Sequence, residues 1–164
     1  MPVNQEVIDL IKSSNNDEDL SDFLQGLNNS ETKVFWEWFK ENAAEYNVSQ
    51  IVFDFKESKC IIGNCYDNAQ VNALKFGLDY CEGVFLTGMS SSLILHGFNI
   101  KDGRVIDLTI TENADEFLHQ EQSLPDVYFG VVIPGNFIKA KSKEASFPKN
   151  NPLLVKYFKE VNSE

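Results

Sequence analysis

A two-residue turn, Asp102-Gly103, constrains the fold of this chain more than any other short stretch. Asp-Gly between runs of apolar and β-branched residues is a strong signal for a tight β-hairpin. If these two residues form the loop, Lys101 pairs with Arg104, and the pairing can be followed outward along both strands. The stretch Leu93–Ile110 therefore predicts two adjacent antiparallel strands in a fixed register.

This register places a histidine and an aspartate on one face of the predicted hairpin. His96 falls opposite Thr109, and Asp107 falls opposite Phe98. Side chains alternate between faces along a strand, so these four residues share a face and His96 is a diagonal neighbour of Asp107. Diagonal neighbours lie about 7–8 Å apart at the backbone, which is within reach of a hydrogen bond between histidine and carboxylate. A slip of one residue would separate them.

Hydrophobic periodicity predicts the other elements of the chain. β-Branched and aromatic runs predict strands at Gln50–Phe55, Tyr80–Leu86 and Val127–Ile133. Apolar residues at helical spacing predict three helices before residue 48, the third capped by Ser30, and later helices at Cys65–Leu78, Asn136–Ser142 and after Pro152.

The order of these elements predicts an α+β fold. Consecutive strands with short connections pair antiparallel, and the apolar face of a sheet needs a covering layer. We expect an antiparallel sheet packed on the central helix that begins at Cys65, with that helix covering the face that holds His96. A length of 164 residues with 43% apolar residues suits one compact domain. Within it, residues 1–48 form a helical extension packed on a core at residues 49–164, and a C-terminal helix completes the core.

The composition excludes several kinds of partner. The formal net charge is −11, and nucleic-acid binding depends on lysine and arginine, so we expect no nucleic-acid partner. No apolar run approaches the roughly 20 residues of a membrane helix, and the first residues lack the features of a signal peptide. We therefore expect a cytoplasmic protein without membrane contact. The basic cluster of Lys139, Lys141, Lys143 and Lys149 is typical of a solvated surface or of a site for an anionic ligand.

The cysteines point to one thiol with a chemical role. Cys60, Cys65 and Cys81 form no C-x-x-C pair, which argues against a zinc site, and their odd number argues against a disulfide framework. Cys65 differs from the other two because it starts a predicted helix, where the helix dipole and loose backbone N–H groups can activate a thiol. Its position alone leaves two interpretations open, a packed structural thiol and a nucleophile.

Cys65, His96 and Asp107 together predict a catalytic triad. Cys65 would attack the substrate, His96 would accept the thiol proton, and Asp107 would orient the imidazole. Each residue also has a structural explanation. A cysteine at a helix start is often packed, a histidine between apolar residues is often a satisfied core residue, and an aspartate before Leu-Thr often caps or ends a strand.

The predicted helix start also offers groups for binding. The backbone N–H of Cys65 or of Tyr66 is a candidate oxyanion donor, and Asn64 or Asn68 is a candidate to add a side-chain amide. Glu82 lies on an otherwise apolar face of its predicted strand. An acid in that position lies at the end of the sheet, is paired, or lines the site.

Four short motifs resemble a known group of cysteine proteins. They are Cys65-Tyr66-Asp67-Asn68-Ala69, Tyr80-Cys81-Glu82-Gly83, His96-Gly97-Phe98-Asn99 and Asp107-Leu108-Thr109. In this order, over residues 50–135, they resemble the transglutaminase-like branch of the papain-like cysteine protein superfamily, and also small phage and bacterial proteins of unassigned function. The resemblance implies a papain-like core, the triad described above, and a binding role for Phe98 and Asn99 beside His96.

The function expected from this pattern is a cysteine-dependent hydrolase or acyl-transfer enzyme that acts on an amide or thioester, with no cofactor and no metal. Its substrate would be a protein or a peptide-like molecule, and the resemblance indicates a phage or mobile-element origin. The helices of residues 1–48 would then dock a host protein or cover the site. Two alternatives stay open: an inactive papain-like module that sequesters or inhibits a host protein, and a small-ligand binder that uses the cleft and the cluster at Lys139–Lys143. The sequence indicates no particular oligomeric state.

Overall fold

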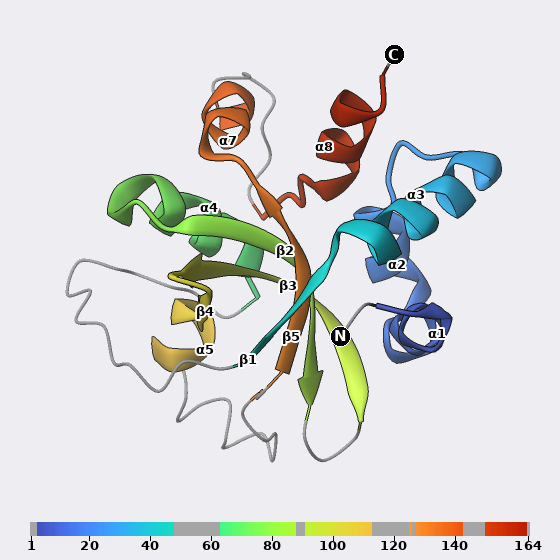
Figure 1. Cartoon of the computed structure of the whole chain (residues 1–164), viewed down its shortest axis with the longest axis horizontal. Helices are drawn as coiled ribbons and strands as arrows, with labels where there is room; N and C mark the ends of the chain where they lie inside the picture. The colour runs from blue at the N-terminus through green and yellow to red at the C-terminus, as the bar shows by residue number, and fades with distance from the viewer. Residues whose placement is uncertain are drawn as a thin grey trace.

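One antiparallel sheet organises the chain, whose computed structural model describes residues 3–47, 63–87, 91–112, 125, 127–142 and 150–163. Five strands lie in the order β1-β5-β2-β3-β4. They are β1 (Ala44–Asn47), β2 (Asp79–Thr87), β3 (Ser92–Lys101), β4 (Arg104–Ile106) and β5 (Val127–Ile133). All described pairings are antiparallel, and Figure 1 shows the sheet curling through the middle of the molecule.

The described part of the chain also contains seven helices (Figure 1). They are α1 (Gln5–Ser14), α2 (Asp17–Phe23), α3 (Asn29–Asn42), α4 (Cys65–Phe76), α5 (Leu108–Glu112), α7 (Gly135–Ser142) and α8 (Leu154–Val161). The fold is therefore α+β with an antiparallel sheet, as the sequence predicts. The predicted strand Gln50–Phe55 lies outside the described residues, as do Cys60, Lys143 and Lys149.

Asparagine side chains begin the three N-terminal helices. Asn4, Asn16 and Asn28 each accept a hydrogen bond from a backbone N–H in the first turn of the helix that follows. Asn28 forms a full capping box with Glu31, so the prediction that Ser30 caps the third helix is wrong. Ser30 lies inside the first turn, and its hydroxyl donates to Asn28 Oδ1.

Strand β1 is an element that the sequence analysis did not predict. It lies within residues 1–48, which were predicted to be helical, and pairs with β5 from Ala44↔Gly130 to Asn47↔Val127. Helix α3 ends because Ala43 adopts an extended conformation, with ψ of 142°. Four residues carry too little periodicity to predict a strand, and the pairing partner is distant in the sequence.

The hairpin forms in the predicted register, although its second strand is shorter than expected. Lys101 pairs with Arg104, and Asp102 and Gly103 have φ of 52° and 76°, as the tight turn requires. Strand β4 ends at Ile106, whereas a strand was predicted to continue to Ile110. The predicted pairing of His96 with Thr109 is therefore wrong. Asp107 caps α5, since its Oδ1 atom accepts the Ile110 N–H at 3.2 Å, and Thr109 lies in that helix.

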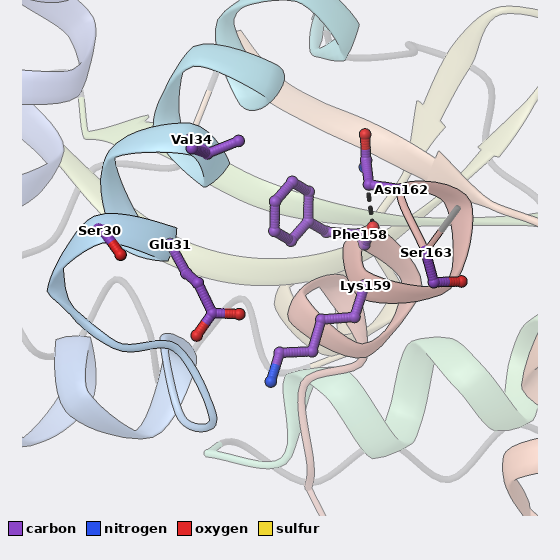
Figure 2. A pocket seen from close by; sticks show the side chains of 7 residues that line it. All are labelled: Ser30, Glu31, Val34, Phe158, Lys159, Asn162 and Ser163. Carbon is purple, nitrogen blue, oxygen red and sulfur yellow. Dashed lines mark hydrogen bonds between the residues drawn. The ribbon is translucent and has the colours of Figure 1, made fainter.

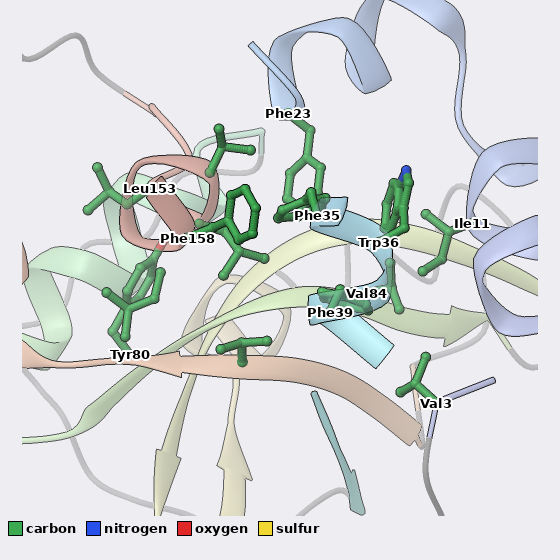
Figure 3. Close-up of a cluster of buried hydrophobic side chains, with 14 of the residues drawn as sticks. Val3, Ile11, Phe23, Phe35, Trp36, Phe39, Tyr80, Val84, Leu153 and Phe158 are labelled. Atoms are coloured by element: carbon green, nitrogen blue, oxygen red, sulfur yellow. The ribbon is translucent and has the colours of Figure 1, made fainter. Parts of the chain in front are cut away.

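Most of the helices cover a single face of the sheet. This face presents Tyr80, Val84, Leu93, Val131 and Ile133, which share one buried cluster with residues from α1, α2, α3, α4, α7 and α8 (Figure 3). Aromatic rings from α3 and α8 fill the centre of this cluster, where Phe35 and Phe158 meet edge to face at 5.4 Å. The main core of the protein therefore lies between the sheet and these helices.

His96 points to the opposite face of the sheet from α4. It pairs with Gly83 in the register and shares its face with Phe85 and Phe98, which belong to a second, smaller cluster. Helix α4 packs on the other face, where the Asn99 side chain donates to the Ala69 carbonyl at 2.9 Å. The expectation that the Cys65 helix covers the histidine face is therefore wrong.

The first turn of α4 packs closely against β3 because the strand has a glycine there. A Cβ atom at Gly97 would lie 2.8 Å from Cδ1 and 3.1 Å from Cα of Tyr66, and 3.4 Å from the carbonyl oxygen of Cys65. Any side chain at position 97 would push the start of α4 away from the sheet. Gly97 thus sets the distance between β3 and Cys65, the first residue of α4.

We expect Gly97→Ala to lower the free energy of unfolding by about 1–3 kcal/mol, because the added methyl overpacks the contact with α4. Urea titration followed by tryptophan fluorescence measures this change. Gly135→Ala is the matched control, since a Cβ atom at Gly135 meets no described atom within 4 Å. Equal stability of the two variants would show that α4 does not depend on this contact.

Candidate functional site

The imidazole of His96 connects the other two members of the predicted triad. Its Nε2 atom lies 2.7 Å from Asp107 Oδ2, and both side chains are buried. The Cys65 side chain lies beside the same ring, close enough to interact with it and to raise its pKa. Because Asp107 takes Nε2, Nδ1 is the ring nitrogen that remains for the thiol. The structure therefore brings Cys65, His96 and Asp107 together in one chain of contacts.

Three donors fix the carboxylate of Asp107. Oδ2 accepts hydrogen bonds from His96 and from the Tyr128 hydroxyl, which lies at 2.7 Å, and Oδ1 accepts the Ile110 N–H. Burial, followed by the neighbouring Asp107 carboxylate, raises the pKa of Tyr128, so its hydroxyl remains a hydrogen-bond donor. Asp107 thus has a defined orientation, and it passes that orientation to the imidazole.

Aromatic rings enclose His96 on the sheet. Phe85 meets the imidazole edge to face at 4.9 Å, and Phe98 lies nearly parallel to it, with ring centroids 6.4 Å apart. Gly130 leaves room for this packing, since a Cβ atom there would lie 3.0 Å from Cζ of Phe98 and 2.8 Å from the sulfur of Cys81. The rings exclude water from one side of the imidazole and hold its plane.

The pKa of His96 reflects opposing effects. Burial disfavours the charged ring and lowers the pKa, whereas the Asp107 carboxylate and the Cys65 side chain raise it, and the balance brings the pKa to about 10. At neutral pH the ring is therefore an imidazolium. A cation beside Cys65 stabilises negative charge that develops on the sulfur.

Cys65 reaches His96 around an edge of the sheet. On the β4 side, the described pairs of β3 run only from Asn99↔Ile106 to Lys101↔Arg104, so no described strand pairs with His96 there. Helix α4 begins beside this edge, where the Cys65 carbonyl oxygen lies next to Gly97. The half-buried Cys65 is the first residue of α4. Its side chain therefore reaches the His96 ring although the ring lies on the face of the sheet opposite to α4.

The candidate oxyanion donors at the helix start have different surroundings. The Tyr66 N–H already donates to Asn150 Oδ1 at 3.0 Å, and the Asn68 amide donates to Thr109 Oγ1 at 2.9 Å. Asn64 is half-buried and makes no capping hydrogen bond with its side chain. The Cys65 N–H occupies the first helical position, which has no acceptor within the helix. Cys65 and Asn64 are therefore the better-placed donors.

Three other residues from the predicted binding set lie away from the thiol. The buried Phe98 packs beneath His96, as described above. Asn99 lies on the α4 face, and its amide donates to the carbonyls of Ala69 and Asp79. Glu82 also lies on that face, as part of β2. The structure brings neither Asn99 nor Glu82 to the imidazole.

Glu82 is paired inside the main core. Its side chain is 0% exposed and accepts hydrogen bonds from the Leu153 N–H at 2.6 Å, the Leu154 N–H at 3.0 Å and the Tyr80 hydroxyl. Burial raises the pKa of Glu82, and these three donors lower it, with a net value of about 7. Gln70 extends the network by donating to the Tyr80 hydroxyl and to the Asn151 carbonyl.

Other features of the described surface lie apart from the triad. A groove of about 480 Å³ between α3 and α8 is lined by Ser30, Glu31, Val34, Phe158, Lys159, Asn162 and Ser163 (Figure 2). Within the described ranges, no group of three or more His, Cys, Asp or Glu side chains is placed to hold a metal ion. None of the described helices has both the length and the apolar character needed to cross a membrane.

Two further residues hold the site without any local signal in the sequence. Tyr128 lies within the predicted strand Val127–Ile133, and its hydroxyl binds Asp107. Asn150, from the C-terminal part of the chain, binds the backbone around Cys65. The sequence around Asn150 predicts only the helix after Pro152, and no local pattern connects Asn150 to Cys65.

Comparisons of the chain with family models, with curated proteins and with solved structures found no match.

We expect Asp107→Asn to lower the pKa of His96 clearly below the wild-type value of about 10, because the carboxylate that most strongly opposes the effect of burial is then absent. An NMR titration of the histidine ring carbons measures the value, and His96→Gln identifies the resonance. Asp102→Asn is the matched control, since it removes an exposed acid from the turn of the same hairpin. A pKa for His96 near 10 in Asp107→Asn would contradict the assigned pairing.

Glu82→Gln should weaken the pH dependence of stability. The pKa of Glu82 is about 7 when folded and about 4.5 when unfolded, so the folded state binds more protons between these values. Wild-type stability therefore falls as pH rises from about 4.5 to 7. Between pH 5 and 8 we expect this fall to be smaller in Glu82→Gln, by about 2 kcal/mol.

Urea titrations at several pH values measure this difference. Glu41→Gln is the control, because Glu41 is exposed on α3. Identical pH slopes for wild type and Glu82→Gln would show that Glu82 does not take up a proton on folding.

Proposed function

We propose that this chain is a cysteine-dependent hydrolase or acyl-transfer enzyme that acts on an amide or thioester. One observation carries the proposal: the buried His96 ring contacts the Asp107 carboxylate at 2.7 Å and also the Cys65 side chain. A buried histidine with a purely structural role needs a hydrogen-bond partner, and Asp107 already meets that need. A thiol at a helix start beside the same ring is not explained by a structural role. The resemblance to the transglutaminase-like branch of the papain-like superfamily agrees with this proposal.

The proposed reaction passes through an acyl-enzyme. The proton of the Cys65 thiol resides on His96, and the resulting thiolate forms a bond to the substrate carbonyl carbon while the negative charge moves to the carbonyl oxygen. The His96 imidazolium then gives a proton to the leaving amine or thiol, and the bond from carbon to the leaving group breaks. Water, or a second nucleophile, loses a proton to neutral His96 and attacks the acyl carbon, which releases Cys65. Asp107 holds the imidazole through both steps.

The surroundings of the triad support this assignment of roles. Tyr128 and the cap of α5 fix Asp107, and the aromatic rings fix the imidazole plane. The Cys65 N–H and the Asn64 amide are the proposed oxyanion donors. The proposed acyl donor is a protein or a peptide-like molecule, and Cys65 and Cys81 are free thiols, as a reducing cytoplasm favours.

Alkylation of the thiols tests the proposal. At pH 6 we expect iodoacetamide to modify Cys65 at least about 100-fold faster than Cys81, because the His96 imidazolium stabilises charge on the sulfur of Cys65. Burial, followed by the neighbouring Glu82, raises the pKa of the Cys81 thiol, which makes Cys81 the internal control. Peptide mass spectrometry after timed labelling measures both rates.

Removal of the imidazole completes this test. His96→Gln should slow alkylation of Cys65 by about tenfold or more, without exposing Cys81. Equally slow labelling of Cys65 and Cys81 in the wild-type protein would contradict the enzyme and would instead support the alternative, an inactive papain-like scaffold that binds a partner.

A further inference from the structure

The side chain of Asn150 brackets the segment that carries Cys65. Its Oδ1 atom accepts the Tyr66 N–H at 3.0 Å, and its Nδ2 atom donates to the Gly63 carbonyl at 2.8 Å. One amide thus binds the backbone directly before and directly after the Asn64-Cys65 pair. Both contacts are long-range, since they join residues more than 80 positions apart.

The backbone of Asn150 presents this amide from a conformation that few residues adopt. Its φ is 54°, in the left-handed region, where asparagine is among the best tolerated of the residues that carry a side chain. The conformation costs of the order of 1 kcal/mol for other side chains, whereas glycine adopts it freely. Asn150→Gly therefore removes the amide without adding backbone strain.

The chain after Asn150 is anchored in the main core. The Asn151 carbonyl accepts a hydrogen bond from Gln70 on α4, and the Leu153 and Leu154 N–H groups donate to Glu82 on β2. Leu153 and Leu154 are both 0% exposed. Residues 150–154, which we call the C-terminal strap, therefore connect the start of α4 to a buried carboxyl group of the sheet.

We propose that Asn150 is a positioning residue for Cys65, and that the C-terminal strap transmits the rigidity of the sheet to the nucleophile. This inference rests on the proposed function. Asn150 touches no reacting atom, and it acts by fixing the backbone from Gly63 to Tyr66. That backbone determines whether the sulfur of Cys65, at the edge of β3, stays against the His96 ring. The hydrogen bonds to Glu82 hold the strap itself in place.

A purely structural role for Asn150 predicts a different result from a positioning role. Loss of two hydrogen bonds would then lower the stability of the whole fold, and every buried thiol would become more accessible in parallel. A positioning role instead changes the chemistry of one thiol. Cys81 is 0% exposed in β2, so its labelling rate reports opening of the fold independently of Cys65.

The experiment compares iodoacetamide labelling of wild type and Asn150→Gly between pH 5 and 9, well below the unfolding temperature. In the variant we expect alkylation of Cys65 at pH 6 to fall about tenfold, because small misplacements of a reacting group have large effects on rate. The rate for Cys81 should not change.

Asn162→Ala is the matched control for this experiment. The Asn162 side chain donates to the Phe158 carbonyl at 2.8 Å, at the far end of α8 (Figure 2). This variant also removes an asparagine hydrogen bond from the C-terminal region, but it does not touch the strap. It should label like wild type at both cysteines.

The outcomes separate this inference from the proposed function. Fast labelling of Cys65 in wild type, with a rate in Asn150→Gly that is within twofold of wild type or higher, would overturn the positioning role and leave the enzyme in place. A parallel rise in Cys81 labelling in the variant would also overturn it, because the effect would then come from opening of the fold. Slow labelling of Cys65 in wild type would contradict the proposed function itself.

Discussion

The close contact between the first turn of α4 and Gly97 determines where Cys65 lies. Helix α4 and the His96 side chain occupy opposite faces of the sheet, so a thiol at most positions of the helix would never meet the imidazole. The meeting happens only because α4 starts beside the edge of β3 and approaches the strand at a residue without a side chain. The contact between Cys65 and His96 therefore depends on where one helix begins and where one strand edge lies, and the rest of the fold keeps these two parts in place.

Two buried acids, one on each face of the sheet, show how environment assigns different roles to the same functional group. Asp107 has a cationic partner in His96 and raises the pKa of that ring. Glu82 accepts hydrogen bonds only from neutral groups, the Tyr80 hydroxyl and the backbone N–H groups of Leu153 and Leu154. These bonds lower its pKa, but burial raises it more, and the net value is about 7. A buried carboxylate without a positive charge nearby is costly. Glu82 therefore joins helix α8 to the sheet, while Asp107 serves the imidazole.

The parts of the site that were predictable from sequence are those fixed by a short local signal. The Asp102-Gly103 turn set the register of β3 and β4, and the register placed His96 near Asp107, as the structure confirms. The same reasoning wrongly extended the second strand beyond Ile106. An aspartate can end a strand by capping a helix, and Asp107 does so for α5. Alternation along β2 correctly placed Glu82 among apolar residues, but its partners on α8 lie about 70 residues away. Tyr128 and Asn150 depend on tertiary contacts in the same way, so their roles carry no local signature.

The long-range contacts explain how the end of a helix can hold Cys65 against the imidazole. Helix termini are less constrained than helix interiors because their backbone groups lack partners within the helix. In this chain the Tyr66 N–H finds its partner in Asn150, which also binds the Gly63 carbonyl before the helix. One turn later the Asn68 side chain adds a hydrogen bond to the Thr109 side chain on α5. Asp107 caps α5, so the group that orients His96 also fixes the helix that supports the Cys65 turn. Cys65 and the imidazole are therefore positioned by overlapping sets of residues, and contacts made for one also resist a shift of the other.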